Sequence, residues 1–223
     1  EYDLADSKAK SPLENMSESR KQRRNAMPVR FAYDAAMPAP IVEWMQQKLK
    51  MSSIDSLMPG ARYHNFKDFL SFPSVYGENL ENTPLTPIRS AAFDLAVTPF
   101  DAIKRGDILL YYPYYGFDYF TEFLRQASYD PKVVSIRINI YRVASHSRVV
   151  NSLIDAANNG KDVTVVVELK ARFDEANNIK WASRLTEAGV HVLFGLPTLK
   201  IHSKLCLITR REEHGYVRYA HIG

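Results

Sequence analysis

The sequence of 223 residues contains a single cysteine, Cys206. One thiol excludes an intramolecular disulfide framework and a cysteine-based zinc site, and it suits a reducing compartment. The chain also lacks any run of about 18 apolar residues and any charged leader followed by an apolar stretch. We therefore predict no membrane-spanning helix and no signal peptide. We expect a cytoplasmic protein, with association to a membrane surface left open.

Neither end of the sequence has the features of a natural terminus. The chain begins with Glu1 rather than methionine and stops at Gly223 inside an apolar, strand-like stretch. We therefore expect a piece of a longer protein. Its composition, with 46% hydrophobic and 24% charged residues, is ordinary for a globular chain that forms a core.

The positive charge of the chain is unevenly distributed. The formal net charge is +4, but residues 132–211 contain 13 Lys and Arg against 6 Asp and Glu, a balance of +7. A basic region of this kind favours phosphate-bearing or other polyanionic partners. A basic surface without a specific ligand is the alternative.

The chain divides into two parts near residue 88, where proline, asparagine and glycine are frequent. Residues 1–88 are predicted to form a partial, mostly helical α+β domain. Its clearest features are a helix that begins near Pro40 and a turn at residues 58–60.

Residues 89–223 alternate between strand and helix patterns. The expected strands are residues 107–113, 133–143, 163–169, 191–194 and 199–208, and the expected helices are residues 117–128, 147–158 and 174–189. A hairpin turn at residues 212–215 leads into a last strand. This alternation predicts an α/β fold with a largely parallel sheet, flanked by helices on both faces, to which an antiparallel hairpin is added.

The stretch 199–208 combines apolar residues with a histidine and two lysines. In a strand, Lys200, His202 and Lys204 would share one face because successive side chains alternate. Two neighbouring ammonium groups disfavour the protonated imidazole, so the neutral ring is free to act as a nucleophile or base. An anionic substrate would balance the charge. A partly exposed edge strand with a solvated charged face is the alternative.

Two arginines follow predicted strands. Arg142 closes the strand at residues 133–143, and Arg172 follows the strand at residues 163–169. Thirty residues separate Arg142 from Arg172, and thirty separate Arg172 from His202. One βα unit takes about thirty residues, so the spacing can return all three to one edge of the sheet, where such folds bind ligands. Guanidinium groups there would hold phosphate oxygens.

A structural role for these arginines is the alternative, in which each pairs with a nearby carboxylate and pins a loop. The candidate carboxylates are Glu168, Asp174 and Glu175.

Several segments carry a family pattern. They are residues 139–143, 165–175, 199–204 and 218–223, together with residues 19–30, 60–69 and 109–114 upstream. In this order they closely resemble bacterial polyphosphate kinase of the first family. Because several long motifs occur in register over essentially the whole chain, the resemblance is specific.

The resemblance implies that His202 is phosphorylated during turnover. In that family the γ-phosphate of ATP passes to a histidine and then, reversibly, to a growing polyphosphate chain. It also implies that Arg142 and Arg172 are tied to Mg²⁺ and that Lys204 stabilises phosphate beside His202. A guanidinium has no lone pair for a cation, so both arginines would hold phosphate oxygens whose other side meets Mg²⁺.

The same resemblance implies a domain organisation. Residues 1–88 would be the end of the middle, dimerisation-linked domain, and residues 89–223 an incomplete first carboxyl-terminal domain similar to phospholipase D. The nucleotide-binding residues would lie outside this chain, so we expect the piece alone to be inactive. Expected partners are ATP or ADP and inorganic polyphosphate, with a homo-oligomeric full-length protein and no nucleic acid.

Two other functions remain open. A phospholipase D-like phosphodiesterase would use His202 against a diester, but Thr209 stands where that family carries an aspartate. A non-catalytic module that binds polyanions is the second.

Three of the remaining histidines, His146, His191 and His214, are interpreted as structural. The roles of His64 and His221 stay open.

Overall fold

The computed structural model describes residues 14–15, 17–18, 22, 26–52, 56–73, 80, 82–169, 171, 174–195 and 199–223. These residues form two compact units, one within residues 18–84 and one mainly within residues 85–223. Within these ranges, no helix combines the length and the apolar content needed to cross a membrane.

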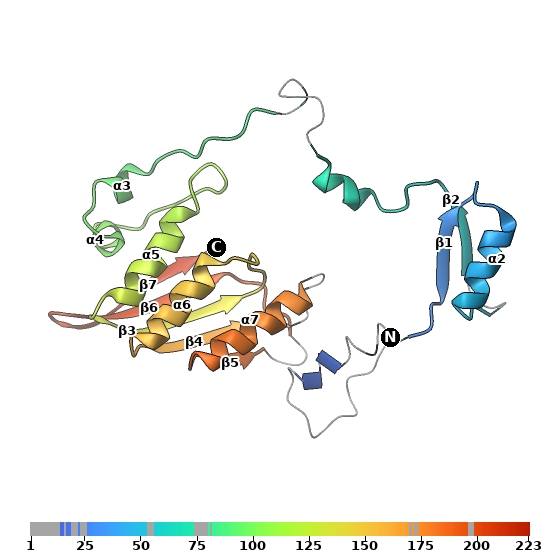
Figure 1. The fold of residues 1–223 in the computed structure, drawn as a ribbon. Coiled ribbons are helices and arrows are strands. Elements are labelled where there is room, and N and C mark those ends of the chain that lie inside the picture. Colours follow the sequence, from blue (N-terminus) through green and yellow to red (C-terminus); the bar gives the residue numbers. More distant parts are fainter. Residues whose placement is uncertain are drawn as a thin grey trace. The chain divides into compact units, whose positions relative to one another are not determined.

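The first unit is built around a two-stranded parallel sheet. Strand β1 (Arg30–Asp34) pairs with β2 (Ser56–Gly60), and helix α2 (Ala39–Lys48) connects them (Figure 1). Parallel strands need such a crossover because a tight turn cannot join them. Pro40 lies in the first turn of α2, as predicted. The predicted turn at residues 58–60 is wrong, since this segment is strand β2, and the prediction of a mostly helical part missed this sheet.

The described remainder of this unit contains a short 3-10 helix, η2 (Phe66–Ser71). Its aromatic side chains are exposed, with Phe66 at 75% and Phe69 at 41%.

The second unit contains a five-stranded sheet in the order β5-β4-β3-β6-β7. Its elements are α3 (Ala91–Asp94), α4 (Pro99–Lys104), α5 (Asp118–Tyr129), β3 (Val133–Ile140), α6 (Arg148–Asn158), β4 (Asp162–Val167), α7 (Glu175–Glu187), β5 (His191–Phe194), β6 (Leu205–Glu212) and β7 (Gly215–Ile222). Strands β3, β4 and β5 are parallel, whereas β6 is antiparallel to both β3 and β7. The sheet is therefore mixed rather than largely parallel, because the hairpin joins it beside β3.

The helices α5, α6 and α7 lie across one face of this sheet (Figure 1). The burial of β4 follows the same division: Val163, Val165 and Val167 are buried. On the opposite face, Leu193 and Leu205 are 50% and 45% exposed. The prediction of helices on both faces is therefore wrong for the part of the unit that the structure describes.

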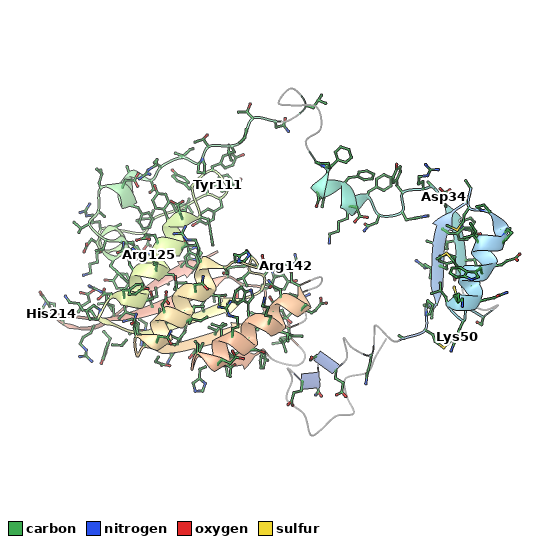
Figure 2. The ribbon with its side chains drawn as sticks, in the orientation of Figure 1. Asp34, Lys50, Tyr111, Arg125, Arg142 and His214 are labelled. Carbon is green, nitrogen blue, oxygen red and sulfur yellow. The ribbon has the colours of Figure 1, made fainter. Side chains whose placement is uncertain are left out.

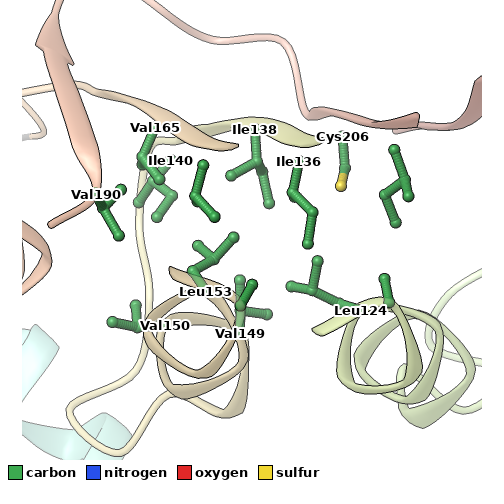
Figure 3. Close-up of a cluster of buried hydrophobic side chains, with 14 of the residues drawn as sticks. Leu124, Ile136, Ile138, Ile140, Val149, Val150, Leu153, Val165, Val190 and Cys206 are labelled. Carbon is green, nitrogen blue, oxygen red and sulfur yellow. The ribbon is translucent and has the colours of Figure 1, made fainter. Parts of the chain in front are cut away.

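The core lies between the sheet and these helices. Figure 3 shows Leu124 of α5 and Leu153 of α6 beneath Ile136, Ile138 and Cys206 of the sheet. All five side chains are at most 7% exposed. Burial of each large aliphatic side chain contributes about 1.5–3 kcal/mol, so this layer fixes the position of β3 firmly.

Two of the helices end at a glycine with left-handed backbone geometry, close to the helix ends that the sequence predicts. Gly160 has φ of 76° after α6, and Gly189 has φ of 81° after α7. A side chain with a Cβ is strained in this conformation, whereas glycine adopts it freely. Each glycine lets the chain turn back into the next strand, so the βα rhythm is confirmed.

Two strand predictions are wrong. Residues 107–113 form no strand, and Leu109 is 89% exposed there. A cis peptide bond joins Tyr112 to Pro113 in this segment. The strand predicted at residues 199–208 begins only at Leu205, because residues 199–204 form an irregular segment before β6.

Candidate functional site

A cavity of about 540 Å³ opens at the carboxyl end of β3. Its wall includes Tyr141, Arg142, His202, Lys204 and His221. Among the described residues that line it there is no aspartate or glutamate. The cavity therefore combines cationic and imidazole groups with an apolar floor, and this composition suits an anionic ligand.

His202 lies at this cavity in the irregular segment before β6, and its side chain is exposed. The Nζ of Lys204 lies 3.5 Å from the Nδ1 of His202 and also donates to the backbone carbonyl of His202. The backbone of Lys204 pairs with Gly223 in both directions, at 3.1 and 2.8 Å. Gly223, which directly follows β7, thus holds the backbone of Lys204 in place beside His202.

Two side chains fasten the backbone on either side of His202. Before it, Oε2 of Glu168 accepts the N–H of Ile201 at 2.8 Å. After it, Asn139 donates to Oγ of Ser203 at 3.1 Å and accepts the N–H of Leu205 at 2.6 Å. Strand β3 provides Asn139, and Glu168 directly follows β4. We call Glu168 and Asn139 the clamp, since together they fix the placement of the histidine segment.

The ring of Tyr141 lies among the charged groups of the site. His202 meets it edge-on, with ring centroids 4.9 Å apart and planes at 69°. Three cations lie over the same ring, with Lys204 at 5.2 Å, Arg142 at 5.4 Å and Lys200 at 5.6 Å from its centroid. The structure thus gathers Lys200, His202 and Lys204, although not through the strand alternation predicted from the sequence.

Arg142 directly follows Tyr141 and is labelled in Figure 2. Its Nε forms an ion pair with Oδ2 of Asp174 at 2.7 Å, and its side chain is 49% exposed. The loop-pinning contact is therefore present, but the same residue also lines the cavity. Arg172, the second predicted arginine, lies outside the described residues.

The carboxyl ends of β3 and β4 are joined by a buried amide from α7. Nδ2 of Asn178 donates to the carbonyls of Tyr141 and Glu168, both at 2.8 Å, and Asn178 is 0% exposed. Nδ2 of the adjacent Asn177 donates to the carbonyl of Val143 at 2.7 Å. Helix α7 therefore sets the backbone from which Tyr141, Arg142 and Glu168 project.

His221 lies on β7 and lines the same cavity. Its ring centroid is 4.1 Å from that of Phe120, and burial lowers the pKa of the imidazole below its ordinary value of 6.5. His221 is therefore mainly neutral at pH 7.

Tyr112 also lines the cavity, and burial raises the pKa of its phenol. Among the described residues its hydroxyl has no hydrogen-bond partner. Cys206 is a core residue that is 1% exposed, and burial raises the pKa of its thiol to about 12.

A cluster of protein ligands for Mg²⁺ is not found in the part of the chain that the structure describes. No group of three His, Cys, Asp or Glu side chains is placed to hold a metal ion there. Mg²⁺ prefers oxygen ligands, and the guanidinium of Arg142 offers no lone pair. The described residues of this site therefore do not fit a directly bound Mg²⁺.

Sequence reasoning missed the residues that organise the site. Asn139 and Tyr141 lie within the quoted motif at residues 139–143, but their side chains were given no role. Glu168 was considered only as an arginine partner. The sequence did contain an indication that Glu168 has a structural partner. Glu168 stands at the end of an apolar stretch, and an acid that is buried in such a place needs a partner. Glu168 is 6% exposed.

The fold and the cavity define an α/β protein whose sheet edge presents a histidine and several cations to an anionic ligand. Residues 98–223 match the model of the polyphosphate kinase C-terminal domain 1, and residues 1–72 match that of the polyphosphate kinase middle domain. The chain belongs to the polyphosphate kinase family.

Relatives and a solved structure agree with this assignment. The polyphosphate kinase of Vibrio vulnificus strain YJ016 is 61% identical over all 223 residues, which cover 32% of that relative. The polyphosphate kinase of Escherichia coli strain K12 is 58% identical over 225 aligned residues, covering all of this chain and 33% of the relative. A crystal structure of polyphosphate kinase from Porphyromonas gingivalis matches with a TM-score of 0.65 and 32% identity, over 84% of this chain and 28% of that one. The chain thus spans about a third of the length of these curated relatives.

Proposed function

We propose that this chain is part of an ATP:polyphosphate phosphotransferase in which His202 carries the phosphoryl group. The observation that supports this most directly is the exposed imidazole of His202 at the cavity, with the ammonium of Lys204 3.5 Å from Nδ1. Family membership supplies the substrates. The division into the end of the middle domain (1–88) and an incomplete first carboxyl-terminal domain (89–223), similar to phospholipase D, belongs to the same proposal.

Two transfers make up the proposed reaction. A lone pair on the ring of His202 attacks the γ-phosphorus of ATP, the bond to the bridging oxygen breaks, and ADP leaves with that electron pair. A terminal oxygen of polyphosphate then attacks the same phosphorus, and the electrons of the P–N bond return to the ring. Each step is reversible, so ADP can also be rephosphorylated.

The residues of this chain would act by placing groups and stabilising charge. Lys204 and Arg142 offer N–H donors to phosphoryl oxygens, whose charge increases in the transition state. Arg172 is proposed for the same role from its place in the sequence. The clamp orients the ring, because a nucleophile held in position reacts much faster than one that moves freely.

Magnesium, ATP and the assembly of the whole protein are part of this proposal. Since the described site offers Mg²⁺ no ligand set, the ion would contact phosphate oxygens rather than Arg142 or Arg172. A homo-oligomeric enzyme in the cytoplasm, acting on ATP and inorganic polyphosphate, completes the proposal. The 223-residue piece alone would be inactive.

The test uses the full-length protein that carries this sequence, incubated with ATP labelled at the γ-phosphate. We expect acid-labile label on the wild type and none on His202→Ala. The matched control is His191→Ala, which removes an exposed histidine of the same domain from β5. Equal labelling of the His202 variant would refute the assignment.

A binding module for polyanions is the second candidate, favoured by the three cations around Tyr141. It predicts salt-dependent polyphosphate binding that His202→Ala leaves unchanged, with no phosphoenzyme in the wild type. A phosphodiesterase would instead turn over a phosphate diester without nucleotide.

A further inference from the structure

The arrangement around Tyr141 has a property that a cluster of ion pairs would lack. Lys200, Lys204 and Arg142 all lie within 6 Å of the centre of one neutral ring, and His202 meets its edge. Like charges this close repel one another. The face of an aromatic ring carries partial negative charge and attracts cations, so the ring offsets part of that repulsion.

Asp174 already pairs with Arg142. A carboxylate in place of the ring would likewise hold Lys200 and Lys204, but it would neutralise them and repel a phosphate. The ring holds these two lysines without adding charge, so their positive charge stays available to an incoming anion. A charge-assisted hydrogen bond to phosphate is stronger than an exposed cation–π contact. The ammonium groups can therefore leave the ring for a phosphate oxygen when one arrives.

The backbone that carries the ring is held in place. Tyr141 directly follows β3, and its carbonyl accepts a hydrogen bond from the buried Asn178. A ring on this backbone can order flexible lysine side chains before the ligand arrives, which lowers the entropy lost on binding.

We propose that Tyr141 is a positioning residue, whose ring face holds Lys200 and Lys204 and whose edge-on contact holds the imidazole of His202, ready for a phosphate chain. This inference rests on the proposed function. It adds to that function a residue that acts through the side chains around it. The ring acts and the hydroxyl does not, so Tyr141→Phe keeps the rate and Tyr141→Leu lowers it.

The experiment measures the rate of His202 phosphorylation in single turnovers of the full-length protein. Tyr141→Phe is expected to match the wild type within about twofold, whereas Tyr141→Leu is slower by roughly 5- to 30-fold, as expected for the two lost cation–π contacts of Lys200 and Lys204. Apparent affinity for polyphosphate falls in the same order.

A graded series separates the electrostatic role from space filling. Phenylalanine carrying one, two or three ring fluorines at position 141 keeps nearly the same shape while its face becomes less negative. The rate should fall steadily with each fluorine. The control places the same series at Tyr129, an exposed tyrosine of α5, where the rate should stay constant.

The outcomes distinguish the inference from the proposed function. A flat series at position 141, or a Leu variant as fast as the wild type, overturns the role of Tyr141 while leaving His202 as the phosphorylated residue. Absence of label from the wild type overturns both.

Discussion

The clamp on the histidine segment can be tested by removing the side chain of Asn139. In Asn139→Leu a side chain of similar size replaces the amide, so the hydrogen bonds to Ser203 and Leu205 are both lost. Each contributes about 0.5–1.5 kcal/mol, so the ordered placement of His202 loses about 1–3 kcal/mol. If that cost appears fully in the transition state, phosphorylation slows by roughly 5- to 150-fold.

The assay is single-turnover transfer of labelled phosphate from ATP to the full-length protein. Ser203→Ala removes only one of the two hydrogen bonds and should slow transfer by roughly 2- to 12-fold. The control is Thr164→Ala on the neighbouring strand β4, which lies outside the clamp and should leave the rate unchanged. Because the clamp orients the ring, the rate should fall while the concentration of ATP at half-saturation stays constant.

A clear result would refute this reasoning. If Asn139→Leu is phosphorylated as fast as the wild type, the hydrogen bonds do not limit the placement of His202. Hydrogen exchange of β3 and β4 provides the check on folding, since unchanged protection would show that the sheet itself is intact.

Two further predictions concern the fold. Lys104, Arg210 and Tyr219 all donate to the Glu212 carboxylate, and although burial opposes its ionisation, these hydrogen bonds lower its pKa from 4.5 to about 2. Ionised Glu212 therefore stabilises the fold above about pH 4.5, and this contribution is lost as the pH falls towards 2. Glu212→Gln should lower the free energy of unfolding by roughly 1–2 kcal/mol at pH 7 and by much less near pH 2. A difference that does not depend on pH would contradict this account. Cys206, buried and with a thiol pKa of about 12, should react with iodoacetamide only after unfolding, so rapid alkylation of the native protein at pH 8 would show that the core around β6 is open.

The sequence predicted the elements whose signals are local. Helices α5, α6 and α7 and strands β3, β4 and β5 were found because apolar periodicity and the left-handed glycines after α6 and α7 mark them. The start of β6 was misplaced because the residues before Leu205 are apolar enough for a strand, while side chains distant in sequence hold them irregular. Those partners are Asn139 and Glu168, 66 and 33 residues away from the backbone groups that they bind.

The sequence indicates the residue types of the candidate site but not their geometry. His202, Lys204 and Arg142 carry chemistry that a sequence can reveal, and all three line one cavity. The ring of Tyr141 and the amide of Asn178 have common structural roles elsewhere, so nothing in their identity marks them. Their importance comes from tertiary contacts that no spacing rule contains.

The buried amide of Asn178 has a consequence for how the site can change. A single side chain ties the strand end that carries Tyr141 and Arg142 to the one that carries Glu168. A displacement of α7 therefore moves the cation-holding ring and one side of the clamp together. We therefore expect that substitutions on the far side of α7, which contact no phosphate, change the rate of phosphorylation and the affinity for polyphosphate together.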